Sequence, residues 1–234
     1  MPYAIITGAT QGIGKAIAET FLKNGIDVAI CARSAADIQG VHAEWTTQYP
    51  NRNIIALQAD LSQKDQAVGF ADKVLEIFPT IDILVNNAGL YFPGNLADEP
   101  EGQLEFMMGV NLYSAYYITR HVLPVMRKQK SGHIFNMCSV ASLKAYPNGG
   151  AYSITKYALL GFSDNLRNEL KDENIKVTAI SSGAVYSRSW EGSGIDPQRI
   201  MEVSDIATMV WATYSLSQRA NVENIIIRPQ KGDL

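Results

Sequence analysis

Short apolar runs, many of them β-branched, alternate with longer amphipathic stretches along the chain, and this alternation limits the fold more than any other feature. Several runs are continuously apolar, which is typical of strands covered on both faces of a parallel sheet. The candidate strands are Tyr3–Thr7, Asp27–Ala32, Asn53–Ala59, Ile81–Asn86, Gly132–Ser139, Lys176–Ser181 and Val222–Arg228.

Helical patterns fill the intervals between these strands. They cover Gly12–Asn24, Ala35–Tyr49, Ser62–Phe78, Gly102–Lys128, Tyr152–Asp172 and Ser204–Leu216. Strand–helix repetition of this kind predicts an α/β fold with one doubly wound, Rossmann-type parallel sheet of seven strands and helices on both faces. Ser62 with Asp65 three residues later resembles a capping box that opens the third helix. We expect one domain over residues 1–234.

Composition excludes several functional classes. The chain carries 20 Lys and Arg against 23 Asp and Glu, a formal charge of −3. Nucleic acids require a concentrated basic face, so we expect no nucleic-acid partner. Cys31 and Cys138 lie in apolar runs without CxxC spacing, which favours core packing over a disulfide or a metal site. Without a signal peptide or a bilayer-length apolar run, the chain is expected to be cytoplasmic and free of membrane contact.

A glycine-rich turn joins the first strand directly to the first helix. It reads Thr7-Gly8-Ala9-Thr10-Gln11-Gly12-Ile13-Gly14. Glycines allow a sharp turn and a close approach of main-chain N–H groups to a pyrophosphate, which then faces the helix N-terminus. In this strand–turn–helix context the turn predicts a nucleotide site. The expected contacts come from Gly8, Thr10, Gln11, Gly12, Ile13 and Gly14.

The glycine spacing and the later motifs together resemble the short-chain dehydrogenase/reductase family over essentially the whole chain. The matching motifs are Gly8-x₃-Gly12-x-Gly14, Asp60, Asn86-Asn87-Ala88-Gly89, Asn111, Ser139 and Tyr152-x₃-Lys156. The resemblance implies an NAD(P)-dependent oxidoreductase that moves a hydride, on the pro-S face, between the cofactor and an alcohol or carbonyl carbon. It also implies a homodimer or homotetramer. Apolar residues on more than one face of the two longest helices agree with an oligomer: Leu112, Tyr116, Leu159 and Phe162.

The end of the second strand bears on the choice of cofactor. An acidic residue about 20 positions after the glycine turn binds the ribose 2′-hydroxyl of NAD, but this strand ends without a carboxylate. Arg33 offers a planar fork of donors to a 2′-phosphate, and Ser34 adds a hydroxyl. The sequence therefore predicts NADP(H), with NAD(H) as the alternative and a solvated Arg33 as the non-functional interpretation.

Further cofactor contacts follow from the resemblance. Asp60 and Leu61 are expected to flank the adenine, and Asn87, Ala88 and Gly89 to line its ribose. After the sixth strand the family usually has Pro-Gly and then a threonine, where this chain has Ser182-Gly183-Ala184-Val185-Tyr186-Ser187. The main chain of Gly183 and Val185 and the hydroxyl of Ser187 are still expected to meet the nicotinamide. The irregular segment Ser182–Met201 is expected to form a substrate lid.

Tyr152 and Lys156 stand four residues apart on a predicted helix, so they share one face. A nearby ammonium favours the phenolate form of a tyrosine, which brings its proton exchange closer to neutral pH. Tyr152 is therefore the candidate proton donor and Lys156 its activator. Both are also expected to contact the cofactor, Lys156 through ribose hydroxyls. Ser139 closes the fifth strand and can donate to a carbonyl oxygen as charge develops there, with Ser142 as a weaker candidate. The family role of Asn111 is to hold a water that relays protons to Lys156.

Substrate identity is less constrained. Tyr91, Phe92, Tyr146, Tyr186 and Trp190 come from segments expected around the reacting centre, and aromatic side chains suit a flat or apolar carbonyl compound. One interpretation is a small-molecule carbonyl reductase similar to sepiapterin reductases. The alternative resembles 3-oxoacyl-carrier-protein reductases, which Arg127, Lys128 and Lys130 favour and Lys171-Asp172-Glu173 disfavours. A third interpretation is an NADP-binding sensor without catalysis.

Overall fold

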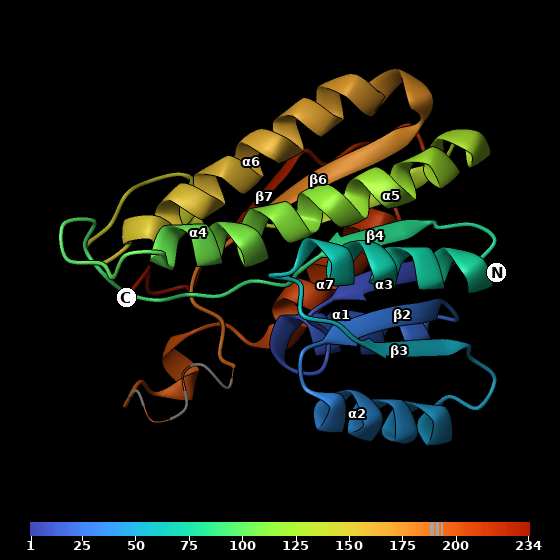
Figure 1. Ribbon diagram of the computed structural model, residues 1–234, viewed down its shortest axis with the longest axis horizontal. Helices are drawn as coiled ribbons and strands as arrows, with labels where there is room; N and C mark the ends of the chain where they lie inside the picture. The colour runs from blue at the N-terminus through green and yellow to red at the C-terminus, as the bar shows by residue number, and fades with distance from the viewer. Residues whose placement is uncertain (188–189, 191, 193) are drawn as a thin grey trace.

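The computed structural model covers residues 1–234 and describes all of them except 188, 189, 191 and 193. In this described part, seven parallel strands form one sheet in the order β3-β2-β1-β4-β5-β6-β7 (Figure 1). They are β1 (Tyr3–Thr7), β2 (Asp27–Ala32), β3 (Ile54–Gln58), β4 (Ile83–Asn86), β5 (Gly132–Met137), β6 (Ile175–Ser182) and β7 (Asn224–Ile227). The predicted doubly wound α/β fold is confirmed.

Helices cover both faces of the sheet, as the continuously apolar strands predict. They are α1 (Gly12–Lys23), α2 (Ala35–Gln48), α3 (Lys64–Ile77), α4 (Gln103–Met108), α5 (Ser114–Gln129), α6 (Gly150–Leu170) and α7 (Val203–Tyr214). The helices α1, α2 and α7 pack on one face, and α3, α5 and α6 pack on the other (Figure 1). Among the described residues, no helix combines the length and apolar character needed to cross a membrane.

The strand order reverses direction at β1, which pairs with β2 on one side and with β4 on the other. The chain runs from β1 outward to β3 and then returns to β4, so the connections after β1 and β4 leave the sheet in opposite directions. In doubly wound sheets such a switch point opens a crevice at the carboxyl ends of the strands, where ligands bind.

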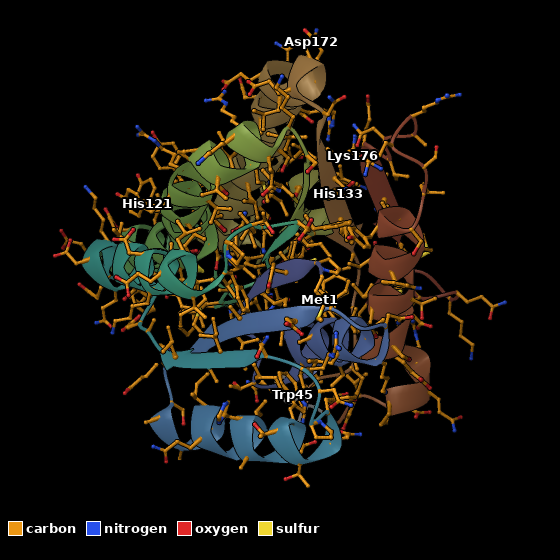
Figure 2. The ribbon with its side chains drawn as sticks, turned by 90° about the vertical axis from the view of Figure 1, so that its right-hand side faces the viewer. Met1, Trp45, His121, His133, Asp172 and Lys176 are labelled. Carbon is orange, nitrogen blue, oxygen red and sulfur yellow. The ribbon has the colours of Figure 1, made fainter. Side chains whose placement is uncertain are left out.

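Among the described residues, two large hydrophobic clusters, one on each face, form most of the core, and a small third cluster contains Cys138. Trp45 is fully buried between α2 and the sheet (Figure 2). Both cysteines are free and buried in the packing, as expected from their apolar surroundings. Burial raises the pKa of the Cys31 thiol to about 12 and that of Cys138 to about 11, so both thiols stay protonated and unreactive at neutral pH.

Two local details differ from the expectation. The helix expected over Gly102–Lys128 forms, but a π-helical turn (Gly109–Tyr113) joins its two parts, α4 and α5. Asn111, a poor helix former, lies within that turn. The capping box expected at Ser62 is wrong, since α3 begins at Lys64 without a side-chain cap. The main-chain N–H of Ser62 instead donates to the Asp60 carboxylate at 3.0 Å.

Candidate active site

The glycine turn lies at the carboxyl end of β1, where the strand order reverses. Gly8 and Gly12 have φ angles of +64° and +58°, a conformation that favours glycine. A Cβ at Gly14 would overlap the Asn87 amide and lie 2.5 Å from the Gly8 oxygen, so only glycine fits there. The helix that follows, α1, has no side-chain cap and no acidic residue in its first turn. Its first N–H groups and its positive dipole end therefore suit a phosphate.

Asn87 and Thr7 hold this turn against the end of β4. The Asn87 amide donates to the main-chain oxygens of Thr7 at 2.8 Å and of Gly8 at 3.0 Å. The Thr7 hydroxyl accepts from the N–H groups of Asn87 at 3.0 Å and of Ala88 at 2.9 Å. Asn87 thus ties the end of β4 to the end of β1.

A cleft of about 1400 Å³ runs along the carboxyl edge from this turn to α6. Most of the residues that the sequence singles out line it: Gly8, Thr10, Gln11, Gly12, Ile13, Gly14, Arg33, Ser34, Asp60, Leu61, Asn87, Ala88, Gly89, Tyr91, Ser139, Tyr146, Tyr152, Lys156, Gly183, Val185, Ser187 and Trp190. Asn111, Phe92 and Tyr186 do not line it. The arrangement fits a dinucleotide, because a phosphate-binding turn and polar groups at both ends share one continuous cleft.

The end of the cleft at β2 is polar. Arg33 is exposed there, and its main-chain oxygen accepts from the Gln58 amide at 3.0 Å. Ser34 caps α2 by accepting from the N–H of Asp37 at 3.2 Å. Asp37, which carries no sequence motif, also lines the cleft. The cation of Arg33, the hydroxyl of Ser34 and the carboxylate of Asp37 therefore belong to the residues that line this end.

Tyr152 and Lys156 come together at the other end, on the first turns of α6. The Lys156 ammonium lies 5.7 Å from the centroid of the Tyr152 ring. It donates to the main-chain oxygen of Met137, the last residue of β5, at 2.8 Å. Lys156 is 5% exposed, so its charge is held inside the protein beside the phenol. A Cβ at Gly89 would lie 3.4 Å from its Nζ, so Gly89 lies beside the ammonium at this end of the cleft.

Ser139 lies two residues after the end of β5 and lines the same end of the cleft. Its hydroxyl accepts from the N–H of Ala141 at 3.2 Å and donates to the Ser182 oxygen at 3.5 Å. The Ser142 hydroxyl accepts from the N–H of Ser139 at 3.2 Å and does not line the cleft. The long Ser139–Ser182 bond can be exchanged for a substrate oxygen, so the geometry favours Ser139 over Ser142.

Asn111 is 1% exposed and sits behind the cleft wall. Its side-chain oxygen accepts from the N–H of Leu90 at 2.7 Å, and its amide donates to the Leu90 oxygen and to the Thr155 hydroxyl, both at 2.9 Å. A Cβ at Gly89 would be 3.4 Å from both the Asn111 oxygen and Lys156 Nζ, so the two groups are neighbours. The Asn111 side chain thus joins the segment after β4 to α6.

Aromatic side chains surround Tyr152. The Tyr91 ring meets the Tyr152 ring edge-on, with centroids 4.9 Å apart. Burial, together with Tyr91 and Tyr152, raises the pKa of Tyr146 above its usual range, so Tyr146 stays a neutral hydrogen-bonding phenol. Trp190 lines the cleft together with Tyr91 and Tyr146. Tyr186 does not line the cleft, and its main-chain N–H donates to the Met201 oxygen at 2.8 Å.

The segment Ser182–Met201 is expected to be a lid, and its two ends pair with each other. Val185 pairs with Met201 in an isolated parallel bridge, and the N–H of Met201 donates to the Ala184 oxygen at 3.1 Å. Residues 188, 189, 191 and 193 of this segment lie outside the described residues.

The C-terminal tail contributes residues that the sequence analysis missed. Arg228, Asp233 and Leu234 line the cleft. Arg228 forms an ion pair with Asp233, and a Cβ at Gly183 would lie 2.9 Å from the Asp233 carboxylate. The Arg199 guanidinium donates to the main-chain oxygens of Lys231, Gly232 and Asp233 at 3.4, 3.0 and 3.2 Å. The tail is thus fixed beside the turn after β6.

A doubly wound sheet with a glycine turn, an Asn-Ala-Gly turn and a Ser, Tyr and Lys set around one cleft defines a dinucleotide-dependent oxidoreductase. The sequence model of the short chain dehydrogenase family matches residues 2–196. The chain belongs to this family and is an NAD(P)-dependent dehydrogenase or reductase.

Individual relatives cover nearly the whole chain. A sepiapterin reductase from Chlorobaculum tepidum is 32% identical over 238 residues, which cover 98% of this chain and 97% of the relative. The solved alcohol dehydrogenase from the archaeon Thermococcus sibiricus, complexed with 5-hydroxy-NADP, is 27% identical with a TM-score of 0.90, covering 98% and 97% of the two chains. A metagenomic short-chain oxidoreductase in complex with NADP is 29% identical with a TM-score of 0.84, at the same coverage.

Proposed function

We propose that the protein is an NADP(H)-dependent reductase of a small carbonyl compound. The observation that carries the proposal is the meeting of Tyr152, Lys156 and Ser139 in the cleft that begins at the glycine turn. A protein that binds a nucleotide without catalysing a reaction has no need for a buried ammonium beside an accessible phenol. This arrangement argues against the sensor interpretation.

The residues that would hold the cofactor follow the cleft. The glycine turn and the start of α1 would bind the pyrophosphate, Asp60 and Leu61 the adenine, and Lys156 the nicotinamide ribose. When bound, the dinucleotide supplies or accepts the hydride. All proton chemistry and all orientation of the substrate fall to the protein side chains.

The proposed proton chemistry starts at Tyr152. Its phenol donates the proton to the carbonyl oxygen of the substrate, while the Ser139 hydroxyl donates a hydrogen bond that orients the same oxygen. The Lys156 ammonium stabilises the phenolate that remains. Because the Asn111 amide is engaged by Leu90 and Thr155, we assign water binding in the relay to a main-chain carbonyl of its π-helical turn.

The preference for NADP(H) rests on Arg33 and Ser34 at the end of β2. Relatives solved with NADP or its 5-hydroxy derivative support this assignment. Asp37 lies in the same lining, and its exposed carboxylate leaves NAD(H) as the alternative. Arg33→Asp should raise the ratio of NAD to NADP affinity, measured by fluorescence titration, at least tenfold. An unchanged ratio would show that Arg33 is solvated and does not bind the 2′-phosphate.

The substrate is proposed to be a flat or apolar carbonyl compound held by Tyr91, Tyr146 and Trp190. The similarity to a sepiapterin reductase supports this class. The alternative, a carrier-protein thioester, requires free basic residues on the surface. Arg127 is instead paired with Glu173 through a two-pronged contact at 2.8 and 2.9 Å, which reduces the basic patch.

The test is a screen of NADPH oxidation with sepiapterin, 1,2-diketones, aldehydes and 3-oxoacyl thioesters. We expect turnover of at least one free carbonyl compound and loss of that turnover in Tyr152→Phe with NADPH binding retained. Turnover of carrier-bound thioesters alone would establish the alternative. Activity that survives in Tyr152→Phe would remove the proposed mechanism.

A homo-oligomer is proposed through the outer faces of α5 and α6. Leu159 belongs to the core at 1% exposure, but Tyr116 and Tyr157 are 37% and 46% exposed. Such aromatic surface is typical of an interface. Size-exclusion chromatography with light scattering should give a dimer or a tetramer, and a monomer would exclude it.

A further inference from the structure

The helix that carries Tyr152 and Lys156 begins without a cap of its own. Its N-cap position is Gly149, which offers no side chain, and the first turn of α6 has no acidic residue. A helix start leaves four main-chain N–H groups without intrahelical partners and carries a positive partial charge. Because Tyr152 is in this first turn, the groups that satisfy these N–H donors also determine where the phenol lies.

Glu99, 52 residues earlier in the chain, supplies the missing cap. Its side-chain oxygen Oε1 accepts from the N–H of Ala151 at 2.7 Å, in a partly buried hydrogen bond. A Cβ at Gly150 would overlap this same oxygen and lie 2.5 Å from the Gly94 oxygen. The absence of a side chain at Gly150 is therefore what lets the carboxylate reach the helix start.

The segment that brings Glu99 to α6 also contacts Tyr152 directly. The N–H groups of Asp98 and Glu99 donate to the Asn95 oxygen at 2.9 and 3.1 Å, which forms the turn that holds Glu99. Earlier in the segment, Tyr91 packs edge-on against Tyr152 at 4.9 Å. The segment thus contacts both the helix start and the phenol ring.

We infer that Glu99 is a positioning residue, which fixes the phenol of Tyr152 by capping α6 across the cleft wall. A carboxylate is favourable at this position because it satisfies an N–H donor and faces the positive end of the helix dipole. Small displacements of a reacting group cost large factors in rate. The inference rests on the proposed role of Tyr152 and adds to it a residue outside the lining of the cleft.

Glu99→Ala tests the inference, with Glu99→Gln and Asp98→Ala as matched variants. Gln keeps an oxygen acceptor for Ala151, and Asp98 is an exposed acid next to Glu99 in sequence. With NADPH and either sepiapterin or 2,3-butanedione as probes, Glu99→Ala should lower kcat roughly ten- to a hundredfold. Glu99→Gln should recover most of that loss, and Asp98→Ala should match the wild type. The Kd for NADPH should change less than about twofold, because Glu99 does not line the cleft that would hold the dinucleotide.

A second measurement needs no cofactor or substrate. Hydrogen exchange followed by mass spectrometry on the cofactor-free protein should show faster exchange over residues 150–155 in Glu99→Ala, and unchanged exchange in α1. If Glu99→Ala is insoluble, Glu99→Asp, whose carboxylate is one methylene short of Ala151, should show the same two effects.

Three outcomes overturn the inference: wild-type kcat in Glu99→Ala, unchanged exchange at the start of α6, or an equal loss in Glu99→Gln and Glu99→Ala. Tyr152→Phe separates these outcomes from a failure of the proposed function. If Tyr152→Phe is inactive while Glu99→Ala is unaffected, only the positioning role is wrong. If Tyr152→Phe remains active, the proposed function itself fails.

Discussion

Lys156 Nζ donates to the main-chain oxygen of Met137 at 2.8 Å, so the last residue of β5 fixes the ammonium one helical turn from Tyr152. A buried cation is costly unless it is paired or hydrogen-bonded. Here the sheet supplies a carbonyl dipole as the partner of the ammonium. A carboxylate in its place would neutralise the positive charge of Lys156. The ammonium therefore remains available to act on the phenol and on ribose hydroxyls.

Replacing Lys156 should impair catalysis. Lys156→Met keeps most of the buried methylene chain but removes the charge and the bond to Met137, so kcat should fall about a hundredfold or more. Lys156→Arg should not rescue the rate, because a planar guanidinium cannot take the place of a compact ammonium. Lys73→Met, on the exposed surface of α3, is the control. The measurement is steady-state reduction of the best carbonyl substrate, and an active Lys156→Met enzyme would contradict the assignment.

Gly14→Ala should weaken cofactor binding, because the new methyl group would overlap the Asn87 amide and push the turn away from β4. We expect at least a tenfold rise in the Kd for NADPH and a loss of about 1–3 kcal/mol in unfolding free energy. Gly69→Ala, in the middle of α3 with open space around its Cβ, is the matched control. It should stabilise the protein by about 0.5–1 kcal/mol and leave the Kd unchanged. Equal Kd values in the two variants would show that the close approach at Gly14 is unimportant.

The glycine turn, Asn87 and the Tyr152–Lys156 pair are predictable because each is a short motif at the end of a strand or on one helix face. Parallel strands bring their carboxyl ends to one edge, so the order of the elements is enough to gather these motifs in one cleft. The π-helical turn at Asn111 is different. An extended amphipathic pattern predicts one helix but not the π-helical turn inside it, where Asn111 bonds to Leu90 and Thr155 from distant segments.

Two further features escape sequence analysis for a similar reason. Local capping patterns cannot find Glu99, because the helix that it caps begins 51 residues later, at Gly150. The tail residues Arg228 and Asp233 carry no motif. Arg228 directly follows β7, and Arg199 binds the main chain at Asp233 beside the cleft. In each case one side chain connects distant segments, and only the fold decides which segments meet.

His133 should make stability depend on pH. Burial, with a smaller contribution from the neighbouring Lys176 ammonium, lowers the pKa of His133 to about 3 (Figure 2). Its Nε2 lies 2.8 Å from the Thr178 hydroxyl oxygen, which itself donates to Val222, so the neutral ring acts as the donor. The unfolded chain binds a proton below about pH 6.5 and the folded one does not, so stability falls as the pH drops from 6.5 towards 3.

The size of this effect follows from the two pKa values. Lowering the pH from 7.5 to 5 should cost about 2 kcal/mol through His133 alone. His133→Gln keeps a donor for Thr178 but does not titrate, so the difference in urea unfolding free energy between the two pH values should shrink by that amount. Parallel pH profiles for the wild type and the variant would show that His133 is not the titrating group.

Releasing the C-terminal tail should weaken substrate binding more than it affects folding. Arg199 donates to three main-chain oxygens of the tail, and Asp233 and Leu234 line the cleft beside the turn after β6. Arg199→Ala should raise KM for the carbonyl substrate about tenfold, equivalent to ~1.4 kcal/mol, with kcat changed less than about threefold. Since these contacts are at the surface, the unfolding free energy should change by less than about 1 kcal/mol.

Deleting residues 229–234 should reproduce the rise in KM, because both changes remove the ordered tail from the cleft. Arg219→Ala, an exposed arginine near the end of α7, is the control and should leave KM unchanged. Adding Arg199→Ala to the protein that lacks residues 229–234 should not raise KM further, since Arg199 then has no tail to bind. A normal KM in the deleted protein, or additive effects in the combination, would show that Arg199 acts on the substrate by another route.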